Sequence, residues 1–244
     1  MGKIIDTQWS KEYKFIEKLK KTAGLTTEKT KNGLVILKPK FDSTKHYYPV
    51  ETQKRKIVLH YTVGSCQAAY DSLTGTEKVS VQYLVARDGT IINLFPDKYW
   101  SYHLGSGAIG GNANMSKESI GIELANYGPL SRKDYELHTW YSTDKKPDVY
   151  CDIGDTNHYF MVNGGYRGYT YFAKPTHEQL EAVDGLIKYL CEKYNIPEAK
   201  LNKDKRYKVF SNAAMAKNFT GICTHANFRS DGKWDIGPGF FSED

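Results

Sequence analysis

The sequence predicts a globular protein of mixed class, either α/β or α+β, because strand patterns and helix patterns alternate along its 244 residues. Residues 57–61 form a short apolar run that is typical of a buried strand. Two β-branched runs flank the pair Asp88-Gly89, which is the strongest short-range signal for a β-hairpin. From Leu180 to Leu190, apolar residues recur at helical spacing, which predicts a long helix.

An amphipathic helix is predicted over residues 7–21 at the N-terminal end of the chain. Its apolar side chains recur at helical spacing, and we expect this face to dock on the rest of the protein. These residues are Trp9, Tyr13, Ile16 and Leu19. The opposite side of the helix carries lysines, at Lys11, Lys14, Lys18 and Lys21. Residues 34–37 then predict a short strand.

We expect a domain boundary near residue 50, because the chain there is polar and punctuated by proline. Residues 1–50 are then a basic N-terminal extension, and residues 51–244 form the main domain. Within the main domain, residues 131–174 are a tyrosine-rich insertion of poor periodicity. The insertion holds seven tyrosines and Trp140.

The main domain is predicted to contain further strands and helices before a C-terminal loop. Strands are expected at residues 57–61, 79–86, 91–95 and 119–126. Helices are expected at residues 66–73, from a capping box at Thr176 to about residue 194, and at residues 211–217. In the strand at 119–126, alternation places Glu123 on the face opposite Ile120, Ile122 and Leu124.

The formal net charge of +6 comes entirely from the N-terminal part of the chain. Residues 1–56 hold 14 Lys and Arg against 6 Asp and Glu, whereas residues 57–244 hold 20 against 22. This excess is either a solvated lysine-rich face or an electrostatic anchor for an anionic surface. We expect no nucleic-acid partner.

Mean hydropathy is −0.59, and no apolar run approaches the ~18 residues of a membrane span, which excludes an integral membrane protein and membrane insertion. The N-terminus has no apolar core or small-residue cleavage site, so we expect no secretion signal and synthesis in the cytoplasm. The four cysteines lack CxxC spacing, which suits a reducing compartment and small buried hydrophobic side chains.

Three residues stand out as candidates for metal chemistry. His60 lies near the end of an apolar strand, and His225 lies in a polar loop ten residues before Asp235. Two histidines and a carboxylate are a recurrent ligand set for catalytic zinc, which keeps a water molecule in its fourth position. The residue types alone leave open the alternative of a hydrogen-bonded core histidine beside an ordinary surface loop.

Five segments, taken in order, resemble the motifs of the zinc-dependent N-acetylmuramoyl-L-alanine amidases, a family that also includes phage lysozyme-type amidases and animal peptidoglycan recognition proteins. The segments are residues 57–65, 79–91, 100–105, 118–124 and 224–238. The resemblance implies an α/β fold in which helices flank a mixed central β-sheet and one zinc ion occupies a surface cleft.

The resemblance also implies roles for individual residues. It matches His60, His225 and Asp235 to the three zinc ligands, Lys233 to the catalytic lysine and Glu123 to the carboxylate base. The alternative for Glu123 is a solvent-facing acid on a strand, and the alternative for Lys233 is an exposed loop lysine. In an extended segment, residues two apart point the same way, so Lys233 and Asp235 are expected to face one cleft.

Two positions depart from the family pattern. His103 matches a histidine that lines the substrate cleft, although its motif here carries two inserted residues. Gln82 stands where many members have a histidine, and an amide cannot titrate. Acid–base chemistry at position 82 is therefore absent.

The implied function is a bacteriolytic hydrolase that degrades cell walls by cleaving the amide between N-acetylmuramic acid and L-alanine in peptidoglycan. Peptidoglycan or muropeptides are the implied partners, and we expect a monomer. Two alternatives are a non-catalytic peptidoglycan-binding module and a cytosolic amidase that recycles muropeptides. The complete ligand set favours an enzyme. A wall-degrading enzyme without a secretion signal is typical of a phage endolysin, which acts on the wall after release.

Overall fold

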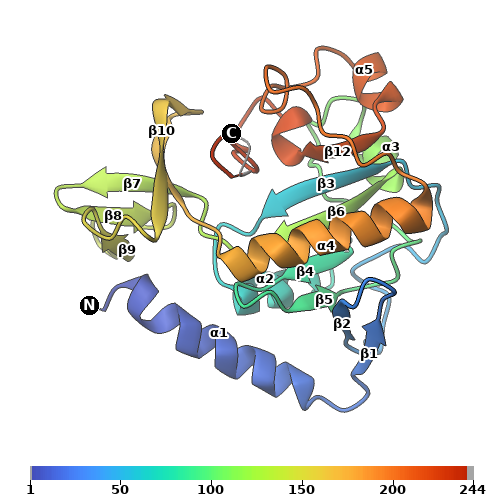
Figure 1. Cartoon of the computed structure of the whole chain (residues 1–244), viewed down its shortest axis with the longest axis horizontal. Coiled ribbons are helices and arrows are strands. Elements are labelled where there is room, and N and C mark those ends of the chain that lie inside the picture. The colour runs from blue at the N-terminus through green and yellow to red at the C-terminus, as the bar shows by residue number, and fades with distance from the viewer. Residues whose placement is uncertain (1, 241–244) are drawn as a thin grey trace.

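The computed structural model describes residues 2–240 and is built on a seven-stranded mixed sheet flanked by helices (Figure 1). Its strand order is β1-β2-β5-β4-β6-β3-β12. The strands are β1 Thr26–Lys29, β2 Val35–Lys38, β3 Lys56–Tyr61, β4 Tyr83–Val85, β5 Ile91–Asn93, β6 Ser119–Leu124 and β12 Gly221–Thr224. Strands β12, β3, β6 and β4 pair in parallel, whereas β4–β5 and β1–β2 are antiparallel. The predicted α/β class is confirmed.

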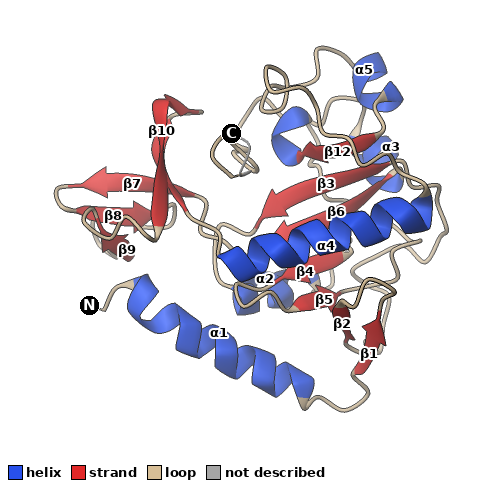
Figure 2. Cartoon of the chain, in the orientation of Figure 1, coloured by secondary structure: helices blue, strands red, loops and turns tan. Residues whose placement is uncertain are grey.

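Helices cover both faces of this sheet (Figure 2). They are α1 Ile4–Lys20, α2 Cys66–Leu73, α3 Asn112–Lys117, α4 His177–Tyr194 and α5 Ala213–Asn218, with a 3-10 turn at His225–Asn227. On one face, α4 packs against the alternate apolar residues of β3 and β6. On the other face, α1 and α2 cover the β4–β5 end, and α3 and α5 cover the β3–β12 end.

Alternation along β3 decides where its histidine points. Ile57 and Leu59 are fully buried in the core beneath α4, so Val58 and His60 face the opposite side of the sheet. In the parallel pairing of β3 with β6, His60 stands directly beside Glu123. The two side chains therefore share one face and lie one strand apart.

At the start of α4, one of the two hydrogen bonds of the predicted capping box forms. Thr176 Oγ1 accepts a hydrogen bond from Gln179 N at 3.1 Å, as the pattern predicts. The Gln179 side chain does not return to the cap, because its Nε2 donates instead to the carbonyl oxygens of Val85 and Ala125. This buried amide ties the first turn of α4 to β4 and to the end of β6.

The tyrosine-rich insertion is a second sheet of five antiparallel strands, in the order β10-β11-β7-β8-β9. The strands are β7 Pro129–Lys133, β8 Glu136–Thr139, β9 Val149–Asp152, β10 Tyr159–Tyr166 and β11 Tyr169–Ala173. Its core is small, with Leu130, Leu137 and Tyr150 at the centre. Much of β10 is at least partly exposed, and such short strands give no clear alternation, so the sequence showed no strand pattern there.

The docking face predicted for α1 is wrong for two of its four residues. Ile16 and Leu19 are buried, but Trp9 and Tyr13 are 42% and 63% exposed. Gln8 and Glu12 are buried instead, and both interact with Arg87 of the main domain. The polar contacts with Arg87, and not the apolar spacing alone, therefore determine which face of α1 packs against the rest of the protein. The lysines at 11, 14, 18 and 21 are exposed, as expected.

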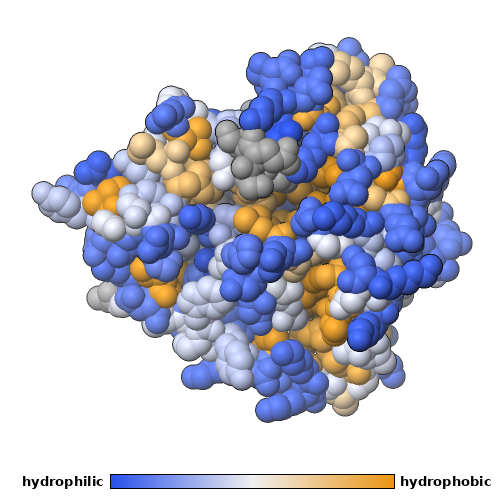
Figure 3. Space-filling model, viewed as in Figure 1, coloured by the Kyte–Doolittle hydropathy of each residue, from blue (hydrophilic) through white to orange (hydrophobic). Residues whose placement is uncertain are grey.

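The surface and the cysteines agree with the composition. Hydrophilic residues predominate on the face shown in Figure 3, and apolar residues form separate patches there. All four cysteines are buried and unpaired. Across residues 2–240, no helix combines the length and the apolar character that crossing a membrane requires.

We predict that the Glu12 carboxylate makes stability pH-dependent. Burial raises its pKa to about 6, although the Arg87 amide that donates to it opposes the shift. The folded state therefore favours the protonated acid, so this group adds stability as the pH falls from 7 to about 4.5. The shift from the usual 4.5 corresponds to about 2 kcal/mol.

Urea unfolding at pH 7 and pH 5 measures this effect. The Glu12→Gln variant has no carboxyl group to titrate at this position. Its free energy of unfolding, relative to that of the wild type, should therefore be higher at pH 7 than at pH 5. Glu17→Gln, which changes a partly exposed acid on the same helix, is the matched control. Parallel pH profiles for Glu12→Gln and wild type would contradict the prediction.

Candidate functional site

Three buried side chains from separate parts of the chain meet at one point. His60 is the residue before the last of β3, His225 begins the turn after β12, and Asp235 lies in the following loop. His60 Nδ1 lies 2.9 Å from His225 Nδ1, and Asp235 Oδ2 lies 3.2 Å and 2.9 Å from these two nitrogens. The structure thus brings together the three residues that the sequence matched to zinc ligands.

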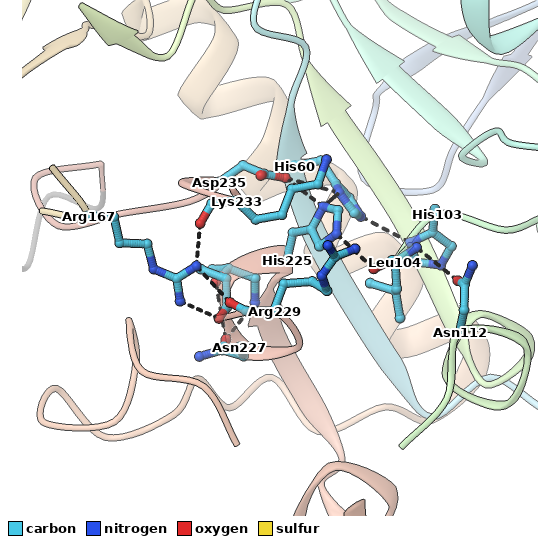
Figure 4. Close-up of polar contacts among 12 residues, drawn as sticks. His60, His103, Leu104, Asn112, Arg167, His225, Asn227, Arg229, Lys233 and Asp235 are labelled. Carbon is cyan, nitrogen blue, oxygen red and sulfur yellow. Dashed lines mark hydrogen bonds and ion pairs between the residues drawn. The ribbon is translucent and has the colours of Figure 1, made fainter. Parts of the chain in front are cut away.

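Hydrogen bonds on the far side of each ring indicate which nitrogen carries the proton. His225 Nε2 lies 3.1 Å from the carbonyl oxygen of Leu104, which can only accept. The proton of a neutral His225 ring therefore sits on Nε2. The Nδ1 lone pair then points toward His60 and Asp235 (Figure 4).

A chain of hydrogen bonds through His103 orients His60 in the same way. Ser119 Oγ donates to the carbonyl oxygen of Met115 at 2.7 Å, so it accepts from His103 Nε2 at 2.9 Å. His103 Nδ1 is then free to accept from His60 Nε2 at 3.0 Å. His60 consequently presents its Nδ1 lone pair to the cluster.

The position of His103 bears on its expected contact with substrate. Only 7% of the residue is exposed, and both of its ring nitrogens have partners inside the protein. It still contributes to the wall of the cleft beside His60. In this arrangement its direct contact is with His60, and contact with substrate stays a prediction.

The electrostatics of the cluster suit a cation. Burial is the main cause that lowers the pKa of His60 to about 4, so this imidazole is neutral at physiological pH. Burial raises the pKa of Asp235, but the imidazoles of His225 and His60 outweigh it and hold that pKa below its usual range. A neutral His60 nitrogen, His225 Nδ1 and the Asp235 carboxylate therefore face one another.

These donors fit a zinc ion. Tetrahedral ligands at ~2.0–2.1 Å from zinc lie about 3.3 Å apart, close to the 2.9–3.2 Å observed. Three lone pairs at this separation repel each other unless positive charge lies between them. The donor set thus matches the two-nitrogen, one-carboxylate pattern of zinc sites that keep an open position.

Glu123 and Lys233 border the same cleft of about 350 Å³. Burial, and then the negative charge of Asp235, raise the pKa of Glu123 to about 8, while Lys233 lowers it. A carboxylate of this kind holds or releases a proton near neutral pH. A carboxyl group with a raised pKa and a lysine therefore line the same cleft as the candidate metal centre.

Gln82, by contrast, has a structural place next to the cleft. Its Oε1 accepts from Gly121 N at 2.7 Å, and its Nε2 donates to the carbonyl oxygen of Tyr99 at 3.0 Å. The side chain therefore links β6 to the loop after β5. It has neither a titratable group nor a free end for proton transfer.

The insertion supplies a clamp on the loop that carries Lys233 and Asp235. Arg167, at the turn between β10 and β11, donates to the carbonyl oxygens of Ala226, Arg229 and Lys233 (Figure 4). In return, Trp234 Nε1 donates to the Arg167 carbonyl oxygen at 3.2 Å. One guanidinium thus satisfies three backbone groups of the loop.

Sequence reasoning missed this contribution of the insertion. Arg167 gave no signal, because its partners are backbone groups about 60 residues away in the chain. Trp140 and Tyr141 also line the cleft, together with Val81 and Tyr102. The adjacent aromatic pair in a polar segment was the only sequence feature that could have indicated them.

Comparison with known proteins gives one family. The family model described as N-acetylmuramoyl-L-alanine amidase matches residues 51–239. That span contains all the candidate residues described above. A search of curated proteins found no match.

Several solved structures are similar to the chain at low identity. A complex of the N-acetylmuramyl-L-alanine amidase AmiD from E. coli with the substrate anhydro-N-acetylmuramic acid-L-Ala-D-gamma-Glu-L-Lys is 20% identical, with a TM-score of 0.44 over 85% of this chain. AmpDh3 from Pseudomonas aeruginosa is 19% identical, with a TM-score of 0.45 over 82%. The chain spans 58% and 61% of the length of these two proteins.

An endolysin from a Clostridium species is also similar. The N-acetylmuramoyl-L-alanine amidase LysCS from Clostridium intestinale is 14% identical, with a TM-score of 0.40. The match covers 80% of this chain and 83% of that chain.

We predict that removing the Arg167 guanidinium loosens the loop that carries Lys233 and Asp235. Hydrogen bonds to a charged group contribute ~1.5–3 kcal/mol each, so losing the equivalent of one should raise local opening about tenfold or more. Hydrogen exchange of the amides of residues 226–236 in Arg167→Gln measures this. Arg132→Gln, which changes an exposed arginine of the same sheet, should leave the loop unchanged. Equal loop exchange in both variants would show that the clamp contributes nothing.

Proposed function

Because the chain belongs to the N-acetylmuramoyl-L-alanine amidase family, we propose that it is a zinc-dependent hydrolase of peptidoglycan. It would cleave the amide between N-acetylmuramic acid and L-alanine. The observation that carries this proposal is the cluster of His60, His225 and Asp235. Two imidazole nitrogens and a carboxylate oxygen of this cluster lie 2.9–3.2 Å from one another, in the cleft that Glu123 and Lys233 also line.

Metal binding and proton transfer would be carried out by different residues of the site. His60, His225 and Asp235 would hold the zinc ion, which when bound lowers the pKa of a water molecule to about 7 and polarises the scissile carbonyl. Glu123 would accept the proton of the attacking water and pass it to the leaving nitrogen. The reaction consumes one water and yields a carboxylic acid on the lactyl group and the free amine of L-alanine.

Lys233 supports the step at which charge develops. Attack on the amide places negative charge on the carbonyl oxygen, and an ammonium group beside the cleft stabilises that charge. Lys233 also favours the ionised form of Glu123, which must be a base before it can accept a proton. Positive charge bound by the neighbouring cluster acts on Glu123 in the same direction.

Two alternatives differ from this proposal, one in catalysis and one in substrate size. A non-catalytic binding module would not need a full ligand set together with Glu123 and Lys233 in one cleft. A recycling amidase shares the same chemistry and differs only in the size of its substrate. The endolysin role, action on the wall after release, and a monomeric state stay predictions.

Incubation with purified sacculi tests the proposed reaction. An amidase releases new N-terminal L-alanine, which end-group analysis detects, and Asp235→Ala serves as the inactive control. New reducing sugar without free L-alanine would overturn the proposal, because it indicates cleavage of the glycan.

We predict that activity depends on the metal cluster. Chelation of zinc should abolish release of L-alanine, and added zinc should restore it. His60→Ala, His225→Ala and Asp235→Ala should each lose zinc, measured by elemental analysis, and activity with it. Full activity in a preparation shown to be metal-free would refute the zinc mechanism.

A second prediction separates chemistry from binding. Glu123→Gln and Lys233→Ala should retain zinc and bind muropeptide, while kcat falls ~10²–10³-fold, as expected when a group that acts in the transition state is lost. Lys203→Ala, which changes an exposed lysine, is the control. Loss of zinc from Glu123→Gln would assign that residue to the metal instead.

A further inference from the structure

Two exposed aromatic side chains of the insertion stand at the mouth of the cleft. Trp140 and Tyr141 directly follow β8, and they are 47% and 63% exposed. Both line the same cleft as His60 and Glu123. Large exposed aromatic groups beside a concave site are typical of binding surfaces, because a ligand that covers them removes apolar area from water.

Trp140 is held in place by the loop of the candidate metal centre. Its ring centroid lies 4.7 Å from that of Trp234 and 6.4 Å from that of Tyr169. Trp234 is itself fixed by its hydrogen bond to the Arg167 carbonyl oxygen. A ligand that stacks on the exposed part of Trp140 therefore meets a preorganised surface and loses little affinity to ordering it.

The turn that carries the two aromatics is also braced. Thr139 Oγ1 donates to the Asp148 carboxylate at 2.6 Å, and Asp148 N donates to Ser142 Oγ at 2.9 Å. Ser142 N completes the turn by donating to the Thr139 carbonyl oxygen at 3.1 Å. These bonds close both ends of the segment that contains Trp140 and Tyr141.

Trp140 lines two neighbouring hollows. The first is the cleft with the candidate metal centre, and the second, of about 910 Å³, lies on the insertion along β7 and β8. Ser131, Tyr135 and Ser142 are among the residues of the second hollow. A long ligand in the cleft can thus continue over the indole onto the insertion, which suits a polymer better than a small muropeptide.

The charges around the second hollow favour a neutral ligand. Its lining holds two cations, Arg132 and Lys133, against three acids, Asp134, Glu136 and Asp144, and Lys133 Nζ pairs with the Asp144 carboxylate at 2.7 Å. Peptide stems carry carboxylates, so a binding site for them would be expected to offer positively charged side chains without acidic partners. A pyranose ring instead offers an apolar C–H face to an indole and hydroxyl groups to nearby serine and threonine side chains.

We propose that Trp140 and Tyr141 form a sugar-binding platform that holds the glycan strand of peptidoglycan at the mouth of the cleft. This inference rests on the proposed function, which supplies a glycan polymer as substrate. The scissile amide belongs to a lactyl group on a sugar of that strand. A sugar stacked on the platform therefore limits where the amide can lie relative to Glu123.

Binding of chitotetraose, the tetramer of β-1,4-linked N-acetylglucosamine, tests the platform. This probe has the glycan backbone but no lactyl amide, so an amidase cannot cleave it and calorimetry records binding alone. Trp140→Ala should weaken Kd about tenfold or more, as loss of a central aromatic contact does, and Trp140→Phe should retain most of the affinity. Tyr141→Ala should have a smaller effect in the same direction.

The chain offers matched controls on α1. Trp9 and Tyr13 are 42% and 63% exposed, so Trp9→Ala and Tyr13→Ala remove comparable aromatic area away from the cleft. Both should bind chitotetraose as the wild type does. Equal losses in Trp9→Ala and Trp140→Ala would overturn the proposal, as would a wild type that does not bind the probe.

A sugar-free probe separates the platform from a peptide site. Trp140→Ala should weaken binding of a lactyl-L-alanyl peptide less than binding of chitotetraose. An equal or larger loss with the peptide would overturn the assignment to sugar. If sacculi release no free L-alanine while Trp140 still binds chitotetraose, the proposed function fails and the sugar platform stands.

Discussion

The parallel pairing of β3 with β6 sets His60 directly beside Glu123, and the remainder of the site is arranged around that pair. The constraint is one of register, because a shift of either strand by one residue would turn its side chain to the opposite face of the sheet and separate His60 from Glu123. That face is filled by the core beneath α4, where Leu59 and Ile122 are fully buried. Apolar packing on one side therefore secures the polar site on the other.

A second requirement is a defined proton position on each buried imidazole. The Leu104 carbonyl sets the tautomer of His225, and the path through His103 to Ser119 sets that of His60. A buried histidine without such partners would cost free energy and could turn its proton toward the cluster. Hydrogen bonds behind the rings thus prepare the donor atoms in front of them.

The insertion joins this site from outside the central sheet. Arg167 binds the carbonyl groups of the loop that carries Lys233 and Asp235 (Figure 4). Trp140 packs on Trp234 in the same loop. One small sheet therefore supports the loop and shapes the mouth of the cleft. This coupling links the placement of the candidate metal ligand Asp235 with the surface that we assign to glycan.

The sequence alone determined features that depend on nearby residues. The apolar run of β3, the Asp88-Gly89 hairpin and the spacing within α4 each report a local periodicity or turn preference, and all three features formed. The hairpin strands β4 and β5 are shorter than the predicted strands at residues 79–86 and 91–95. The family motifs also selected His60, His225 and Asp235, which the fold brings together. Their roles as ligands stay proposals, as do those of Glu123, Lys233 and His103.

Only the tertiary structure decided the features that depend on distant partners. Glu12 occupies the inward side of α1 because Arg87 receives it there, although apolar spacing favoured Trp9 and Tyr13. The strands of the insertion form because each finds a neighbour, since their own alternation is weak. Arg167 reaches the loop across about 60 residues of sequence. Local patterns carry no information on such long-range pairing, and so the folded chain alone determines it.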